Sequence, residues 1–144
     1  MKRRTMISCL FGACLFAAVV LPGREANARR GVPPENHDNV PVVRPDGKAL
    51  TPDKVRAAIV TATTQLRWTI LEDNPGTIAA NLSLRGKHSM TVEIRYTGQT
   101  FSITYRDSSN LNYGRGGHGT DIHPTYNKEV RKLLNAINNT LQRV

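Results

Sequence analysis

The arrangement of apolar and polar residues divides the chain into an apolar start, an irregular stretch and a long region of regular periodicity. Thr51 can cap a helix, Pro52 suits its first position, and the helical pattern changes near Leu66. Between these positions apolar residues recur three or four apart, as on one face of a helix; they are Val55, Ala58, Ile59, Ala62 and Leu66. The sequence therefore predicts a helix from Pro52 to about Leu66.

From Arg67 onward apolar residues alternate with polar ones, which is typical of strands with one buried and one exposed face. Short turn signals separate the runs, so the strands are expected to follow one another as an antiparallel meander. Four strands are predicted, with these apolar positions: Trp68 and Ile70; Ile78, Ala80, Leu82 and Leu84; Met90, Val92, Ile94 and Tyr96; Phe101, Ile103 and Tyr105.

Turn lengths predict how the last three strands pair. A two-residue type II′ turn that begins with glycine would place Tyr96 opposite Phe101. A three-residue loop at 86–88 would place Leu84 opposite Met90, whereas a two-residue loop there would break the apolar face. The apolar side chains of these strands are therefore expected on one side of the sheet.

The chain ends in a second amphipathic helix, which is predicted to start near Pro124. Its apolar stripe consists of Tyr126, Val130, Leu133, Leu134, Ile137 and Leu141. Because the sheet has one apolar face, both helices are expected to cover that face. The expected fold is α+β: a four-stranded antiparallel meander with two helices on one face, a two-layer sandwich in the order α-β-β-β-β-α.

Residues 1–28 have the three parts of a cleavable signal peptide. Positive residues at 2–4 precede the apolar run 6–21, and Ala26-Asn27-Ala28 supplies the small residues of a cleavage site. The apolar run is shorter than the roughly 20 residues of a membrane-spanning helix, so no transmembrane segment is expected after cleavage. The protein is expected to be periplasmic or secreted. The pattern does not decide between the general secretory and twin-arginine routes.

Residues 29–49 are expected to be a flexible linker, because four prolines interrupt a polar run with little periodicity. Three valines at 40, 42 and 43 could still lie along a sheet edge. Residues 50–144 would then form a single α+β domain. Both cysteines lie inside the signal, so the exported chain is expected to have no disulfide and no cysteine-ligated metal.

The basic composition bears on the choice of partner. A formal net charge of +9 favours acidic partners, although it also favours solubility. Nucleic-acid binding is not expected, because the predicted aromatic side chains point inward rather than alternating with exposed basic residues. The glycine-rich stretch lacks the Lys-Ser/Thr of a phosphate loop, and no cofactor is expected. An envelope protein or an acidic envelope polymer is the expected partner.

Two candidate binding surfaces follow from the predicted strands. The exposed face of the sheet carries Arg95 and Arg106, which suits an acidic partner but is also what an ordinary solvated face contains. The loop after the last strand could line a polar pocket against the second helix, or its side chains could simply bond its own amides. The candidate residues of this pocket are Asp107, Ser109, Asn110, Asn112, Tyr113, His123 and Asn127.

The glycine-rich segment 114–123 contains side chains that can bind a metal, namely His118, Asp121 and His123. They support an alternative function, a small metal- or histidine-dependent hydrolase. Four glycines would make it costly to hold three ligands in place. The chain has neither a nucleophile elbow nor the paired carboxylates of glycosidases, so a binding module is favoured over an enzyme.

Four stretches of the sequence resemble a family of small exported proteins and lipoproteins of Gram-negative bacteria. They are the runs Thr77 to Tyr96 and Thr100 to Tyr105, the loop Ser108 to Tyr113 and the helix start Ile122 to Asn127. The resemblance covers roughly residues 52–142 and implies an exported location, but the family has no assigned activity. This chain lacks the acceptor cysteine of lipoprotein members, which implies a soluble periplasmic form, and its glycines at 114–119 are unusual. The expected function is an exported binding or accessory module of the cell envelope.

Overall fold

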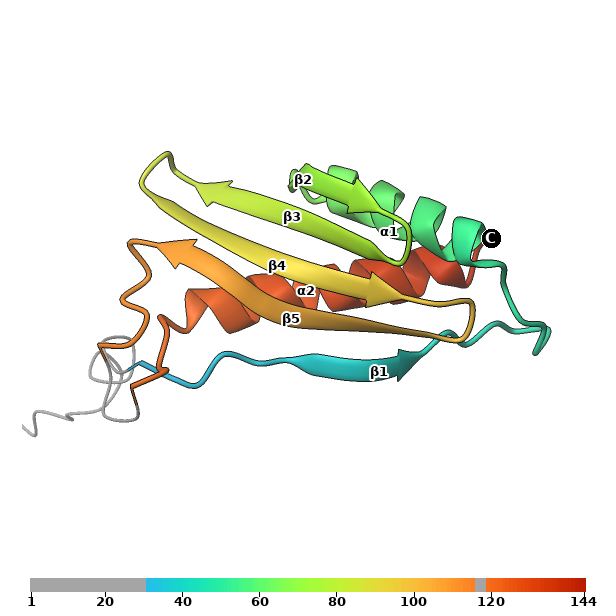
Figure 1. The fold of residues 1–144 in the computed structure, drawn as a ribbon, viewed down its shortest axis with the longest axis horizontal. Helices are drawn as coiled ribbons and strands as arrows, with labels where there is room; N and C mark the ends of the chain where they lie inside the picture. The colour runs from blue at the N-terminus through green and yellow to red at the C-terminus, as the bar shows by residue number, and fades with distance from the viewer. Residues whose placement is uncertain (1–30, 116–118) are drawn as a thin grey trace, which may run out of the picture.

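The computed structural model describes residues 31–115 and 119–144 of the chain, so the predicted signal peptide lies outside the described residues. The described residues form an antiparallel five-stranded sheet and two helices, an α+β fold (Figure 1). The elements are β1 (His37–Pro41), α1 (Pro52–Gln65), β2 (Thr69–Asn74), β3 (Thr77–Leu84), β4 (His88–Tyr96), β5 (Thr100–Ser109) and α2 (Thr125–Leu141).

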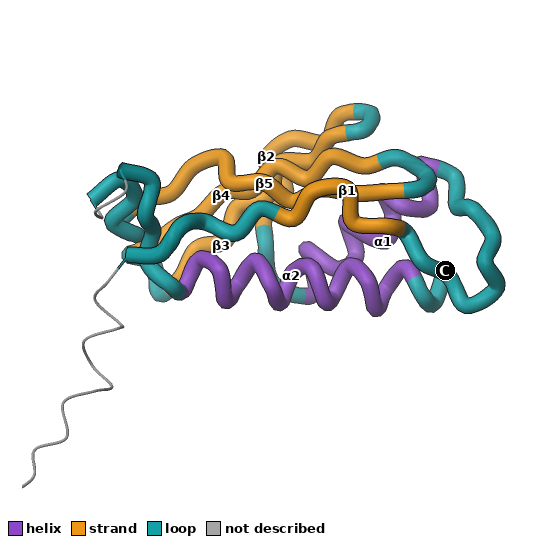
Figure 2. Tube along the Cα trace, turned by 90° about the horizontal axis from the view of Figure 1, so that it is seen from below, coloured by secondary structure: helices purple, strands orange, loops and turns teal. Residues whose placement is uncertain are grey.

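Both helices lie on the same face of the sheet, as the periodicity predicted (Figure 2). The strand order is β1-β5-β4-β3-β2, so β2 to β5 form the predicted meander and α1 connects the two edge strands. The core lies between the layers, and Ile59 of α1, Val92 of β4 and Leu133 of α2 are fully buried there. Within the described residues, no helix has both the length and the apolar character that crossing a membrane requires.

The prediction of four strands is wrong, because part of the expected linker forms a fifth. β1 pairs antiparallel with β5 and places Val40 opposite Phe101. Further towards the N-terminus, Val32 forms a two-way backbone bridge with Ile122. A proline can occupy an edge strand, since its missing amide hydrogen can face away from the sheet. The prolines of this segment therefore did not prevent the pairing.

The first helix begins and ends as predicted. Thr51 is its N-cap and accepts a hydrogen bond from the amide of Lys54 at 3.4 Å, and Pro52 is the first helical residue. After the helix, Arg67 has a left-handed φ of 63° and the amide of Trp68 donates to the carbonyl oxygen of Thr63. This reversal directs the chain into β2.

The β4–β5 hairpin has the predicted register, with Tyr96 opposite Phe101. In the β3–β4 hairpin the predicted register is wrong by two residues, since Leu84 lies opposite His88 rather than Met90. A shift of two positions keeps every side chain on its predicted face. It nevertheless moves His88 out of the loop and into the first position of β4.

A β-bulge changes the second half of β5. Val92 lies opposite Tyr105 but Thr91 lies opposite Asp107, so Arg106 is the extra residue. Simple alternation would instead have placed Thr91 opposite Arg106. After the bulge the strand continues to Ser109, which carries the following loop towards the start of α2.

Candidate functional site

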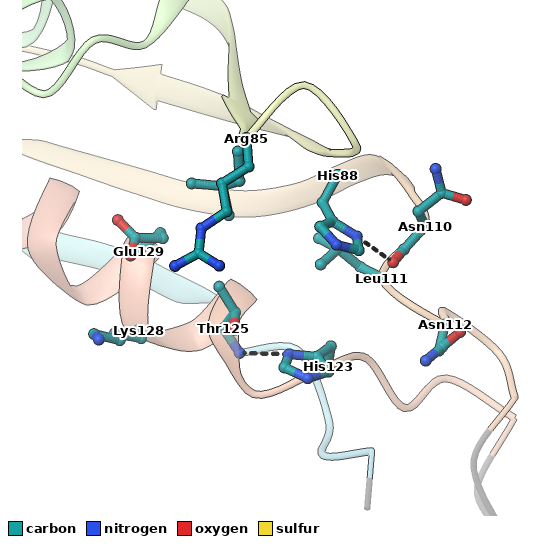
Figure 3. A pocket seen from close by; sticks show the side chains of 10 residues that line it. Arg85, His88, Asn110, Leu111, Asn112, His123, Thr125, Lys128 and Glu129 are labelled. Carbon is teal, nitrogen blue, oxygen red and sulfur yellow. Dashed lines mark hydrogen bonds between the residues drawn. The ribbon is translucent and has the colours of Figure 1, made fainter. Parts of the chain in front are cut away.

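A cavity of about 460 Å³ opens at one end of the molecule, between the β3–β4 hairpin, the loop after β5 and the start of α2 (Figure 3). We call it the hairpin pocket; its lining residues are Leu84, Arg85, His88, Asn110, Leu111, Asn112, His123, Thr125, Lys128 and Glu129. Its volume is within the roughly 300–1,000 Å³ of small-molecule sites. Because three distant parts of the chain line it, the pocket exists only in the folded protein.

The loop after β5 is held in place by its own residues. Leu111 is only 3% exposed and anchors the loop in the core. On either side of it, Asn110 and Asn112 have left-handed φ values of 58° and 56°, a conformation that asparagine tolerates. The amide of His123 donates to the carbonyl oxygen of Leu111 at 2.8 Å, which joins this loop to the segment before α2.

Two histidines line the hairpin pocket, and backbone contacts determine where each neutral ring carries its hydrogen. Nδ1 of His88 lies 2.8 Å from the carbonyl oxygen of Asn110, so Nδ1 must donate and Nε2 can accept. Nδ1 of His123 accepts from the amide of Thr125 at 3.2 Å, so its Nε2 carries the hydrogen. The pocket therefore offers one imidazole acceptor and one imidazole donor (Figure 3).

Two cations also line the hairpin pocket. Within the described residues, the side chains of Arg85 and Lys128 form neither a hydrogen bond nor an ion pair. The one carboxylate of the lining, Glu129, accepts a hydrogen bond at 2.8 Å from Lys132, which lies outside the pocket. The pocket is therefore positively charged and can attract an anion.

The predicted basic platform on the outer face of the sheet is neutralised by neighbouring carboxylates. Arg95 donates to Glu93 at 2.7 Å, and Arg106 donates to Glu72 at 2.6 Å. The hydrogen bond from Arg106 holds the pKa of Glu72 below its usual value. These two arginines are remote from the hairpin pocket and do not line it.

The residues predicted for the polar pocket lie in more than one place. Asn110 and His123 line the hairpin pocket. Asp107 and Tyr113 line an adjoining depression of about 280 Å³, which shares Asn110, Leu111 and Asn112 with the hairpin pocket. There the ring of Tyr113 stacks on that of Tyr105 with centroids 4.4 Å apart.

Asn127 is buried beneath the N-terminal arm, by which we mean residues 31–41. Its Oδ1 accepts from the amide of Glu35, and its Nδ2 donates to the carbonyl oxygen of Pro33, both at 2.9 Å. Since all these partners belong to the chain itself, Asn127 has a structural role in the ligand-free protein.

Among the predicted metal ligands, His118 lies outside the described residues. Asp121 is buried and packs closely on Gly31, where an added side-chain carbon would lie 2.7 Å from the Asp121 Cβ atom. His123 already uses its Nδ1 lone pair for the Thr125 amide. Among the residues described, no three histidine, cysteine or acidic side chains are grouped so as to hold a metal ion.

Sequence reasoning did not assign Arg85, His88 or Lys128 to a pocket, and it placed Arg85 on the exposed face of the sheet. The available signal was the basic hairpin tip Arg85-Gly86-Lys87-His88, which is an unusual concentration of charge for a turn. Nothing in the sequence pattern shows that this tip lies over the start of α2, because the two segments are about forty positions apart.

Comparison with known proteins gives no match to a family model, a curated protein or a solved structure. The resemblance to small exported proteins of Gram-negative bacteria therefore stays a prediction from the sequence.

Proposed function

We propose that this protein is an exported binding or accessory module of the cell envelope, periplasmic or secreted, and that it binds its ligand in the hairpin pocket. The observation that carries the proposal is the pocket itself. One imidazole acceptor, one imidazole donor, the amide of Asn112 and two cations without internal partners in the described residues line a cavity of suitable size. The signal-like residues 1–28 support an exported location, and an acidic envelope component would match the positive lining.

The alternative, a metal- or histidine-dependent hydrolase built on His118, Asp121 and His123, has less support. Metal ligation through the Nε2 of His123 requires that nitrogen to lose its hydrogen, and the Thr125 amide favours the opposite tautomer. The alternative predicts stabilisation by zinc that disappears in the variant His118→Ala.

The binding surface can be tested by photo-crosslinking in living cells. A photoreactive residue placed at Thr125 reports on the hairpin pocket, and the same residue at Arg95 reports on the outer face of the sheet. Thr125 is only partly buried and Arg95 is exposed, so neither substitution is expected to impair folding. We expect an adduct with an envelope component from Thr125 only. An adduct from Arg95 only would move the site to the sheet, and no adduct from either position would argue against a binding module.

Export is tested separately by recovering the protein from fractionated cells and determining its N-terminus. Cleavage after Ala28 predicts a periplasmic or secreted chain that begins at Arg29. An intact chain found only in the cytoplasm would overturn the exported part of the proposal.

A further inference from the structure

We propose that the ligand of the hairpin pocket is a hydroxylated organic acid, such as a sugar acid. Its carboxylate would lie between Arg85 and Lys128, and its hydroxyl groups would lie against the imidazoles and Asn112. This inference rests on the proposed function and adds the chemical class of the ligand.

The first argument is that two cations line the pocket without an internal partner in the described part of the chain. Among the same residues, unpaired cations also occur on the open surface, as at Arg67 and Arg143, whereas five arginines pair with a carboxylate of the chain: Arg44, Arg56, Arg95, Arg106 and Arg131. Arg85 lacks such a partner within the described residues, although it lines a cavity. On α2, Lys132 pairs with Glu129, whereas Lys128 at the pocket does not pair. An anion from outside can take the place of the missing carboxylate.

The second argument concerns the position of Lys128 in α2. A lysine in the first turn lies near the positive end of the helix dipole, where a cation is unfavourable. The first turn contains no acidic residue, and Pro124 provides no side-chain cap. Arg85 adds a further positive charge from the hairpin above (Figure 3). Glu129 is the one carboxylate of the lining, and it pairs with Lys132. The ligand-free pocket therefore has an excess of positive charge, which a bound carboxylate would reduce.

The third argument concerns the neutral part of the lining. A hydroxyl group both donates and accepts hydrogen bonds. The Nε2 of His88 is available as an acceptor, the Nε2–H of His123 is available as a donor, and the amide of Asn112 can do both. Leu84 and Leu111 give the lining apolar carbon surface, as in many small-ligand sites. A carboxylate with adjacent hydroxyl groups matches this combination better than a simple inorganic anion does.

The test is a titration of the chain, as recovered from the cell, followed by amide NMR. The ligands are D-glucuronate, D-glucose, which lacks the carboxylate, and acetate, which lacks the hydroxyl groups. We expect glucuronate to shift the amides of residues 84–88, 110–112 and 123–129 and to bind about tenfold or more tightly than either comparison compound. Equal binding of glucose would overturn the role of the carboxylate. Equal binding of acetate would overturn the role of the hydroxyl groups.

A matched pair of variants tests the part played by Arg85. Arg85 and Arg67 are both exposed, both have left-handed φ values and both lack an ion pair within the described residues. Arg85→Gln is expected to weaken glucuronate binding about three- to tenfold, and Arg67→Gln is expected to leave it unchanged. Equal effects of the two variants would mean that only net charge matters, which contradicts the assigned site.

The variant Lys128→Gln separates a binding role of this lysine from a purely structural role, because unfolding temperature and ligand binding are expected to respond differently. Because the like-charge repulsion falls, the ligand-free variant is expected to unfold at the same or a higher temperature than the parent. Its binding of glucuronate is nevertheless expected to be weaker. A lower unfolding temperature together with unchanged binding would overturn the proposal.

The two proposals can fail separately. A crosslink from Thr125 without glucuronate binding would refute the organic acid and leave the hairpin pocket as the binding site. Glucuronate binding at residues outside the pocket would refute both the assigned site and the role of its cations.

Discussion

At the residue scale, the sequence correctly predicted a tight turn at Gly98, but it did not predict why glycine is needed there. Glycine at this turn predicted a type II′ hairpin, which requires a positive φ. Gly98 does not have one. Instead, Thr97 Oγ1 accepts hydrogen bonds from the amides of Gln99 and Thr100, and Gly98 packs directly on the carbonyl oxygen of Leu50. Glycine is needed there for space.

We therefore predict that Gly98→Ala destabilises the protein by about 1–3 kcal/mol. The added methyl carbon would lie 2.3 Å from the carbonyl oxygen of Leu50, so the turn and the residues before α1 must move apart. Chemical denaturation measures the loss. Gln99→Ala, a substitution at the neighbouring exposed position, is the control and should change stability little. Similar effects of both variants would show that the close approach is unimportant.

Tyr126 carries a buried polar group that the fold does not use. Its side chain is fully buried, and within the described residues its hydroxyl has no hydrogen-bond partner. The ring packs edge-on against Tyr105, with centroids 5.5 Å apart. Burial strongly raises the pKa of the Tyr126 hydroxyl, and the nearby Tyr105 raises it further.

We predict that Tyr126→Phe leaves stability unchanged or increases it by up to about 2 kcal/mol at neutral pH, since it removes an unsatisfied buried hydroxyl. The sign of the pH effect follows from the raised pKa. The folded protein holds this proton more tightly than the unfolded chain, so stability falls as pH rises above about 10. Thermal unfolding at pH 8 and pH 10.5 should show a smaller alkaline loss in the variant. A clear loss of stability at pH 8 would reveal an unseen partner for the hydroxyl.

At the element scale, the N-terminal arm is joined to α2 by side chains and not only by β1. Arg131 forms a two-pronged ion pair with the carboxylate of Glu35. Asn127 holds the backbone on either side of Pro34. The hydrogen bond from Arg131 holds the pKa of Glu35 below its usual value, and the charges of Arg131 and His37 act in the same direction.

This contact predicts an acid-sensitive arm. A carboxyl group with a lowered pKa stabilises the fold above its unfolded pKa, near 4.3, and that contribution is lost as pH falls through the folded value. Glu35→Gln should lower the unfolding temperature at pH 7 and have little effect at pH 3, where the parent has lost the same interaction. Calorimetry at the two pH values gives the comparison. An equal effect at both would mean that packing of the side chain, rather than its charge, holds the arm.

At the scale of the whole molecule, periodicity predicted both helices, the meander and the face on which the helices lie. It could not predict the β3–β4 register, because a shift of two residues leaves every side chain on the same face. That shift placed His88 at the hairpin pocket. The pocket itself depends on contacts between a hairpin, a loop and a helix start that are distant in sequence, and no local pattern records such contacts. Asn110 and His123 could be predicted as pocket residues, because the residue types of a turn and of a helix start are recognisable in a short stretch of sequence.

Also at the scale of the whole molecule, the sequence predicted that residues 31–49 belong to a linker, whereas in the structure part of this segment belongs to the sheet. As a linker they would be dispensable, but β1 covers the edge of β5 and the arm bonds to Asn127.

A chain that begins at Ala49 would expose the amide and carbonyl groups of β5, and exposed strand edges pair with other chains. We predict that this truncated chain loses about 2–4 kcal/mol of stability and self-associates. Denaturation and analytical ultracentrifugation measure the two effects. A monomeric chain of unchanged stability would mean that the arm is a dispensable linker after all, whereas the predicted loss would place the start of the folded unit at the arm.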